Sequence, residues 1–194
     1  RSILIYYDPM QISYSQLEAT ILALNIESLD LTVTSAPKVV EVPTVYGGEY
    51  GPDLEYVASR TGLSVGEVTS IHSSTDYMIY MMGFTPGFTY LGGMSKRIAT
   101  PRRDTPRTVI PAGSVAIADE QTGIYQTKSP GGWQLIGRTP IRLFDADSDP
   151  PVALTIGDCI RFVPVLESEY SYIHRQLQST GHTIATRQTS SERE

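Results

Sequence analysis

Short apolar runs separated by glycine- and proline-rich turns dominate the chain after residue 76. Apolar, β-branched and aromatic positions predict strands at 77–82, 114–118, 123–126, 133–136, 141–144 and 159–163. Five or more short strands at this close spacing indicate a closed barrel or a sandwich. The pattern therefore predicts a mainly β fold.

The N-terminal part of the chain predicts α/β structure. The apolar run 2–7 predicts a strand, and because the chain starts inside it without Met, we expect an N-terminal piece to be missing. Ser15 and Glu18 form a capping-box pair ahead of apolar residues at helical spacing. Residues 38–46 predict another strand, in which Pro43 indicates an edge position or an irregularity.

Two short helices are expected next. Pro52 is placed to be the first residue of one helix, and Gly62 is placed to end it. Ser64 and Glu67 form a second capping-box pair, which predicts a helix that ends near His72.

The charge balance and composition exclude several classes of protein. Fifteen Lys and Arg against 21 Asp and Glu give a net charge of −6, which argues against nucleic acid or an anionic membrane as a partner. No apolar run approaches the roughly 18 residues of a membrane span, and no signal-peptide pattern opens the chain. Cys159 is the only cysteine, so we expect no disulfide framework and a cytoplasmic location.

Motifs for metal and phosphate binding do not occur in the sequence. His72, His174 and His182 are scattered, so no metal site is expected. Neither G-x-x-x-x-G-K-[ST] nor a strand-linked G-x-G-x-x-G is present. Cys159 lies in a β-like run, where an inert packed thiol is favoured over a nucleophile.

Three segments carry candidate chemistry. His72 follows a helix end, where imidazole is suited to general acid or base catalysis, and the alternative is a structural, hydrogen-bonded histidine. Residues 100–107 place three arginines on a proline-stiffened loop that suits carboxylate or phosphate, unless the loop is solvated and paired to Asp104. Residues 129–134 combine two glycines with Trp133. The glycines either let the backbone approach a ligand beside the indole ring, or belong to an ordinary turn next to a core tryptophan.

Seven segments together resemble the KipI/PxpB family, also called the allophanate hydrolase subunit 1 family. In chain order they are VPTVYGGEYGPDL at 42–54, HSS at 72–74, GFTPGFTYLG at 83–92, TPR at 100–102, PAGSV at 111–115, QTGIY at 121–125 and SPGGWQLIGRT at 129–139. The order and number of these segments make chance agreement negligible.

The resemblance implies a small α/β domain followed by a cyclophilin-like β-barrel. Residues 1–38 would be the C-terminal part of the α/β domain, and residues 39–166 the barrel. Residues 167–194 would form a C-terminal helix, expected over 167–178, and a polar tail.

The resemblance also implies an activity. Similar proteins are the B component of an ATP-dependent 5-oxoprolinase, which opens 5-oxo-L-proline to L-glutamate together with subunits A and C. ATP, with Mg²⁺, would be shared with these partners, and this component alone would be inactive. The alternatives are a KipI-like inhibitor of a sporulation histidine kinase and a carboxyltransferase-like subunit of urea carboxylase or allophanate metabolism; peptidyl-prolyl isomerisation ranks last, because a fold alone does not determine function.

The resemblance assigns candidate site residues. For catalysis it implies His72 for proton transfer, with Arg102 and Arg138 for anions. For substrate or nucleotide binding it implies Tyr46, Glu49, Asp53, Phe84, Pro86, Tyr90, Gln121, Tyr125, Ser129, Gly131, Gly132 and Trp133. The chain departs from the family at Asp119 and Glu120, where small residues are usual, and these carboxylates either face solvent or alter anion binding.

Two spatial expectations follow. The site segments should converge on one face of the barrel, because binding residues gather on the loops at a barrel rim. The apolar and aromatic segment 77–88 should form a surface for the C component, because methionine and aromatic residues are enriched at interface cores. The alternative is that alternate residues of this segment fill the barrel and cover a helix.

Overall fold

The computed structural model describes residues 4–24, 37–152, 154–180 and 188–189. The chain divides into two units, Arg1–Ala36 and Pro37–Glu194, which are described separately. The first unit contains helix α1, Tyr14–Leu22, at the place where the sequence predicts a helix.

The other two predictions for the first unit are wrong. The described part of the predicted strand 2–7 is not a strand, and its residues Leu4 and Tyr6 are 74% and 88% exposed. A strand needs a hydrogen-bonded neighbour, and the structure describes none for this segment. The capping box of α1 is formed by Ser13 and Gln16, earlier in the chain than expected, because glutamine serves at the third helical position as well as glutamate.

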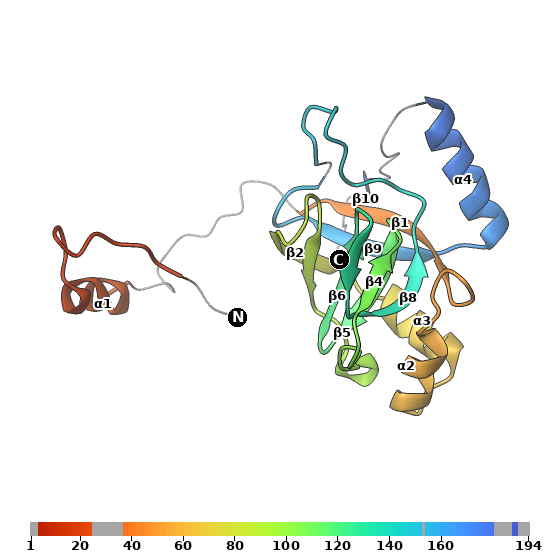
Figure 1. The fold of residues 1–194 in the computed structure, drawn as a ribbon, viewed down its shortest axis with the longest axis horizontal. Helices are drawn as coiled ribbons and strands as arrows, with labels where there is room; N and C mark the ends of the chain where they lie inside the picture. Colours follow the sequence, from red (N-terminus) through yellow and green to blue (C-terminus); the bar gives the residue numbers. More distant parts are fainter. Residues whose placement is uncertain (1–3, 25–36, 153, 181–187, 190–194) are drawn as a thin grey trace. The chain divides into compact units, whose positions relative to one another are not determined.

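The second unit is a closed β-barrel (Figure 1). Its strands follow one another in the order β1-β8-β5-β6-β3-β2-β9, and β9 pairs with β1 in parallel to close it. Their bounds are β1 Val39–Tyr46, β2 Tyr77–Met82, β3 Thr89–Gly92, β5 Ser114–Ala118, β6 Gln121–Tyr125, β8 Gln134–Arg138 and β9 Cys159–Pro164. The barrel confirms the predicted mainly β fold class and excludes the sandwich.

Smaller elements surround the barrel. Strands β4, Arg107–Ile110, and β7, Ser129–Gly131, form a separate two-stranded sheet. Helix α4, Glu167–Thr180, confirms the predicted C-terminal helix, and β10, Gln188–Thr189, pairs with β1 where a polar tail was expected. The rest of that tail lies outside the described residues. No helix in the described part of the chain is long and apolar enough to cross a membrane.

Two strand predictions need correction. Strand β1 is not at an edge, so the second alternative for Pro43, an irregularity, applies. Pro43 lies between the antiparallel pairings of β1 with β10 and with β8, where its missing N–H interrupts neither pairing. Residues 141–144 form no strand; only Phe144 makes an isolated bridge, to Val152. Ile141 and Leu143 are nevertheless buried, so burial in a loop produced the strand-like pattern.

Two helices pack beside the barrel. Helix α2, Leu54–Thr61, begins after Asp53, so the prediction of Pro52 as its first residue is wrong. Gly62 ends α2 in the left-handed conformation, with φ of 70°, as expected for a glycine at this position. Helix α3, Val65–Ser73, is capped by Ser64 and Glu67 as predicted.

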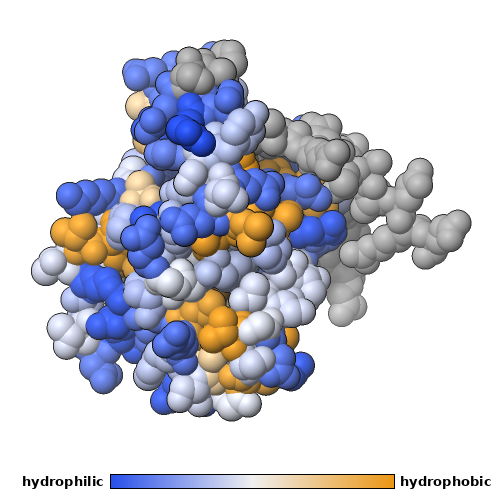
Figure 2. Space-filling model, turned by 90° about the vertical axis from the view of Figure 1, so that its right-hand side faces the viewer, coloured by the Kyte–Doolittle hydropathy of each residue, from blue (hydrophilic) through white to orange (hydrophobic). Residues whose placement is uncertain are grey.

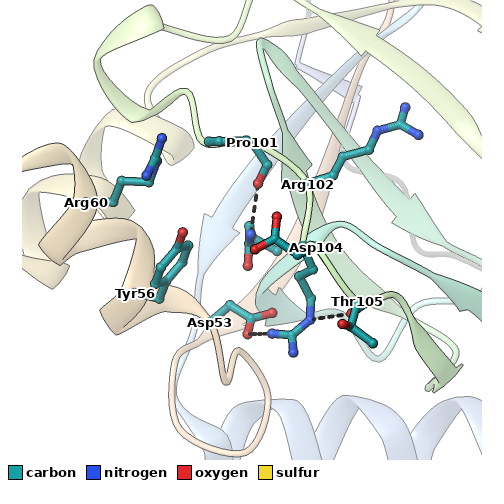
Figure 3. A pocket seen from close by; sticks show the side chains of 9 residues that line it. Asp53, Tyr56, Arg60, Pro101, Arg102, Asp104 and Thr105 are labelled. Atoms are coloured by element: carbon teal, nitrogen blue, oxygen red, sulfur yellow. Dashed lines mark hydrogen bonds and ion pairs between the residues drawn. The ribbon is translucent and has the colours of Figure 1, made fainter.

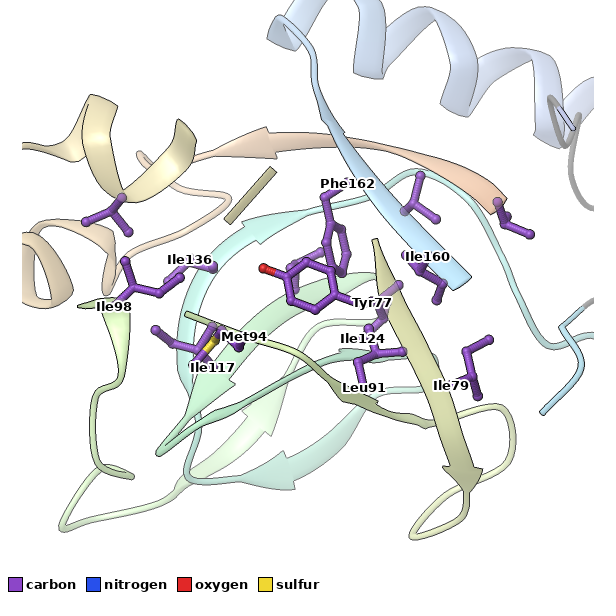
Figure 4. Packing of buried hydrophobic residues seen from close by; sticks show 14 of the residues in the cluster. Tyr77, Ile79, Leu91, Met94, Ile98, Ile117, Ile124, Ile136, Ile160 and Phe162 are labelled. Carbon is purple, nitrogen blue, oxygen red and sulfur yellow. The ribbon is translucent and has the colours of Figure 1, made fainter. Parts of the chain in front are cut away.

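Strands β5, β6 and β8 bury both of their faces. One cluster of apolar side chains, including Tyr77, Ile124 and Phe162, fills the interior (Figure 4). Val57 of α2 and Val68 of α3 extend the same cluster. A second cluster lies on the outer face of β5, β6 and β8 and consists of Phe88, Ile110, Ala116, Ala118, Tyr125, Trp133 and Leu135. Because side chains alternate along a strand, neighbouring residues of one strand contribute to different clusters.

Candidate functional site

Asp53 ties α2 to two distant segments. Its carboxylate accepts two hydrogen bonds of 2.8 Å from Arg107, one of 3.1 Å from Arg103 and one of 2.7 Å from the backbone N–H of Leu135. Asp53 is only 5% exposed, and its side chain caps no helix N–H because these partners occupy it. A buried carboxylate held by two guanidinium groups fixes the arginine-rich loop against the barrel.

An open hollow with a volume of about 540 Å³ lies between α2 and this loop (Figure 3). Tyr56 and Arg60 line it from α2, and residues 101–105 line it from the loop. Asp53 and Gln134 complete the lining, and Gln134 donates a 2.8 Å hydrogen bond to the carbonyl of Pro101. The hollow therefore joins a helix face, a cationic loop and the start of β8.

An aromatic cluster lies on the outer face of the barrel. The ring of Phe88 makes edge-to-face contacts with Phe84, Tyr90, Tyr125 and Trp133, with centroids 5.1–5.6 Å apart. Edge-to-face packing of this kind is the favoured geometry for aromatic pairs. Burial raises the pKa of Tyr125, so its hydroxyl stays protonated at neutral pH.

Glycines let this cluster form. A Cβ at Gly123 would lie 3.0 Å from the ring of Phe88 and 3.3 Å from that of Trp133. A Cβ at Gly131 would lie 2.5 Å from the hydroxyl oxygen of Tyr125. Glycine at these two positions is therefore required by the close approach of aromatic rings to the backbone.

Arg102 links the aromatic cluster to the hollow. Its guanidinium carbon lies 5.9 Å from the centroid of the Trp133 ring, within the range of a cation–π contact, while the residue also lines the hollow. The backbone N–H of Arg103 donates a 2.7 Å hydrogen bond to the carbonyl of Gly132. The structure thus brings together two of the segments singled out in the sequence, 100–107 and 129–134.

Arg138 lies elsewhere. It is the last residue of β8, four residues or about 13 Å along the strand from Gln134 at the hollow. Its guanidinium lies 5.5 Å from the ring centroid of Tyr50 and donates a 3.5 Å hydrogen bond to the carbonyl of Glu49. Arg102 and Arg138 therefore do not share one anion site in this structure.

His72 is part of the barrel interior. It is fully buried, and its ring nitrogens lie 2.7 Å from the hydroxyl of Tyr46 and 2.8 Å from Oγ1 of Thr122. Thr122 donates its own proton to the carbonyl of Ala116, so it accepts from Nε2–H of His72, and Tyr46 donates to Nδ1. Burial lowers the pKa of His72 to about 3.

This environment corrects the sequence prediction for His72. The helix end was expected to favour the charged imidazole, but burial dominates and the ring is neutral at physiological pH. With both ring nitrogens engaged and no exposed surface, His72 has no route to a substrate proton in this structure. It is the structural histidine that the sequence left as the alternative, and Tyr46 is its hydrogen-bond partner rather than a ligand-facing residue.

The remaining predicted residues, Pro86, Ser129 and Gln121, lie in three different places. Pro86 lies in the tight turn before Phe88, beside the aromatic cluster. Ser129 pairs with Ile110 in the β4–β7 sheet, and its buried hydroxyl has no partner among the described residues. Gln121 starts β6 beside the Asp119–Glu120 turn, at the end of the strand away from Tyr125.

The predicted convergence therefore holds for part of the set only. The outer face gathers the aromatic cluster, Arg102, Gly131 and Gly132, whereas His72 faces the interior on the other side of β6. Sequence reasoning missed Tyr56 and Arg60, which are four residues apart and so share one face of α2. Their spacing was the only signal in the sequence. It points to a site only when the structure shows the loop 101–105 on the opposite side of the hollow.

Comparisons with known proteins identify the family. Residues 1–154 match the family described as carboxyltransferase domain, subdomain C and D. The chain belongs to this family. It is 56% identical over 133 residues to the B component of 5-oxoprolinase from Bacillus subtilis (strain 168), a match that covers 69% of this chain and 55% of that protein. It is 51% identical over 130 residues to the B component of 5-oxoprolinase from Escherichia coli O157:H7, a match that covers 67% and 60% of the two chains.

These relatives confirm the resemblance seen in the sequence. The chain spans a little over half the length of the two proteins. Among solved structures, a conserved uncharacterized protein of Pyrococcus horikoshii is 48% identical, with a TM-score of 0.67 over 84% of this chain and 74% of that one. Urea amidolyase of K. lactis has a TM-score of 0.70 over 94% of this chain and 13% of its own, but at 21% identity it shows a shared fold alone.

Proposed function

We propose that this chain is the barrel part of the B component of an ATP-dependent 5-oxoprolinase, which opens 5-oxo-L-proline to L-glutamate. The observation that carries the proposal is the 56% identity to a protein named as that component of 5-oxoprolinase. The cationic hollow supports it, because the substrate carries a carboxylate and arginine binds carboxylates well.

The chemistry explains why such an enzyme requires ATP. A five-membered lactam is a poor electrophile, and transfer of a phosphoryl group to its amide oxygen makes the ring carbonyl open to attack by water. The C–N bond then breaks and the nitrogen takes up a proton, which leaves an acyl phosphate. A second water hydrolyses this acyl phosphate, so that phosphate leaves and the carboxylate of L-glutamate forms. This chain's part is to bind and orient an anionic group through Arg60.

ATP and Mg²⁺ would be shared with partner subunits. The sequence has no phosphate-binding loop motif, and no group of three His, Cys, Asp or Glu side chains in the described ranges is placed to hold a metal ion. We therefore propose that the chain is inactive alone and acts with subunits A and C in the cytoplasm, where ATP is available.

Strand β2 offers a surface for the C component. Tyr77 and Ile79 are buried in the barrel, as the alternative expected, but the register shifts after Ile79. The side chains of Met78, Met81 and, just after the strand, Phe84 are exposed, Phe84 by 65%. On the face that carries α2, α3 and α4, apolar residues lie in separate patches among hydrophilic ones (Figure 2). Strand β2 lies on the other side of the barrel (Figure 1), and its row of methionine and aromatic side chains suits an interface core.

Affinity measurements with the purified C component test this surface. We expect Phe84→Asp to weaken binding at least tenfold, because a charge would enter an apolar contact, whereas Tyr172→Asp on exposed α4 leaves it unchanged. Phe88 is only 2% exposed and unsuitable for this purpose, since Asp at that position would disturb folding. Equal binding by both variants and the unchanged protein would exclude the surface at Phe84 as the interface.

Glutamate release tests the activity itself. The protein mixed with subunits A and C should convert 5-oxo-L-proline to L-glutamate only when ATP is present, and each subunit alone should not. Absence of ATP-dependent release from the complete mixture would overturn the proposal. Robust release by this protein alone would overturn the proposed dependence on partners.

Carboxyl transfer is the second candidate, because the matching family is named for a carboxyltransferase domain. It predicts ATP- and bicarbonate-dependent carboxylation of urea by a complex that also contains a biotin carrier. The same mixture of proteins with the biotin carrier added, supplied with bicarbonate and urea in place of 5-oxoproline, separates the two activities.

A further inference from the structure

Two cations at the hollow have no carboxylate partner. The ion pairs of the described residues engage Arg103 and Arg107 with Asp53 but leave Arg60 and Arg102 unpaired. Figure 3 shows Arg60 on the α2 side and Arg102 on the loop side of the hollow, with Pro101 between them. Both guanidinium groups therefore lack a carboxylate, but they are directed away from each other, so Arg60 is the one that faces the Tyr56 side of the hollow.

The local charge has the opposite sign to the whole chain. The hollow and its anchoring pair contain four arginines, Arg60, Arg102, Arg103 and Arg107, against two aspartates, Asp53 and Asp104, a local excess of two positive charges. The chain carries a net charge of −6. A positive hollow on an acidic protein concentrates small anions at this place.

The hollow also contains one buried hydrogen-bond acceptor without a donor among the described residues. Gln134 lines it and is 2% exposed, and its Oε1 has no partner among the described residues. Asp104 lines the same hollow without an ion pair to the arginines described there. Because a buried acceptor without a donor, such as Gln134 Oε1, is costly, a ligand that brings an N–H recovers free energy at this site.

We propose that the hollow binds a small carboxylate that carries an N–H beside it, with the carboxylate at Arg60 and Tyr56 and the N–H at Gln134 or Asp104. This inference rests on the proposed function for its specific ligand, because 5-oxo-L-proline has a ring N–H next to the carbon that bears its carboxylate. A volume of about 540 Å³ is in the usual range for small-molecule sites and leaves room for a second group beside the ring.

Three ligands test recognition of the carboxylate and recognition of the N–H separately. Binding to the protein is measured by isothermal titration for 5-oxo-L-proline, for its lactone analogue 5-oxotetrahydrofuran-2-carboxylate, and for 2-pyrrolidinone. The lactone replaces only the N–H by oxygen, and pyrrolidinone lacks only the carboxylate. We expect each analogue to bind at least tenfold more weakly than 5-oxo-L-proline, since each loses one charge-assisted or buried hydrogen bond.

Variants at two residues of α2 locate the site. Arg60→Gln should weaken 5-oxo-L-proline binding about tenfold or more, and Tyr56→Phe should weaken it less. Arg175→Gln on exposed α4 is the matched control and should leave binding unchanged. Because Arg60 is exposed, its variant is expected to fold, and thermal unfolding checks this.

The outcomes distinguish this inference from the proposed function. If the complete complex releases glutamate but Arg60→Gln changes neither the dissociation constant nor KM for 5-oxo-L-proline, the hollow is not the site and the function stands. If the complex is inactive but the protein binds 5-oxo-L-proline in an Arg60-dependent way, the site stands and the function fails. Equal binding of all three ligands, or no binding of any, also overturns the inference.

Discussion

The neutral, buried state of His72 makes fold stability depend on pH in a specific direction. In the folded protein burial holds the pKa of His72 at about 3, against an ordinary value of 6.5. In the unfolded chain the imidazole takes up a proton near its ordinary pKa, so acid favours the unfolded state. The stabilisation is complete above about pH 6.5 and is lost as the pH falls from there toward 3.

The size of the effect follows from linkage. Each pKa unit corresponds to about 1.4 kcal/mol, and between pH 7 and pH 5 the unfolded imidazole becomes almost fully protonated while the folded one stays neutral. The free energy of unfolding should therefore fall by about 2 kcal/mol over this range because of His72 alone. Protonation would also force Tyr46 to give up its hydrogen bond to Nδ1, which acts in the same direction.

Urea unfolding at pH 7, 6 and 5 measures this effect in the unchanged protein and in His72→Gln. Glutamine keeps one donor for Thr122 and one acceptor for Tyr46, so the variant should be less stable at pH 7 but lose about 2 kcal/mol less on acidification. His174→Gln, on exposed α4, is the control and should keep the pH dependence. Identical pH slopes for the unchanged protein and His72→Gln, or a His72 proton resonance that titrates near pH 6.5, would refute the reasoning.

Two further substitutions test the packing of the site. Asp53→Ala should lower the free energy of unfolding, measured in urea, by about 3–5 kcal/mol, because it leaves two guanidinium groups without their carboxylate. The control, Asp104→Ala, should change this free energy by less than about 0.5 kcal/mol. Gly131→Ala should cost about 1–3 kcal/mol, since its Cβ would meet Tyr125 at 2.5 Å, and Gly132→Ala, with 3.6 Å to its nearest neighbour, should cost much less. Equal effects within either pair would contradict the contacts described.

Local signals in the sequence predicted local structure well. The capping box of Ser64 and Glu67 and the stop at Gly62 depend on residues a few positions apart, and the structure confirms both. The short apolar runs between glycine- and proline-rich turns likewise predicted a mainly β fold. The loop 141–144 misled because burial alone gives the same apolar pattern without strand pairing.

The candidate site depended on contacts that sequence spacing does not show. Asp53 meets Arg103, Arg107 and Leu135 at separations of 50, 54 and 82 residues, which only the closed barrel brings together. The neutral state of His72 has the same origin, because its burial arises when α3 packs onto the strands. The resemblance indicated segments, but it did not show which of their residues face inward.

The segment QTGIY of strand β6 contributes side chains both to the barrel interior and to the outer aromatic cluster. Thr122 faces the interior and holds His72, while Tyr125 faces outward into the aromatic cluster beside Trp133. Gly123 between them has no side chain, so the rings of the outer cluster rest directly on the strand. The hydrogen bonds of His72 inside the barrel therefore hold β6 in place. The outer face of β6 supports Trp133, and Trp133 in turn contacts Arg102 at the hollow. In this arrangement the neutral histidine belongs to the interior network, and the arginines, whose side chains are suited to an anion, lie outside the barrel.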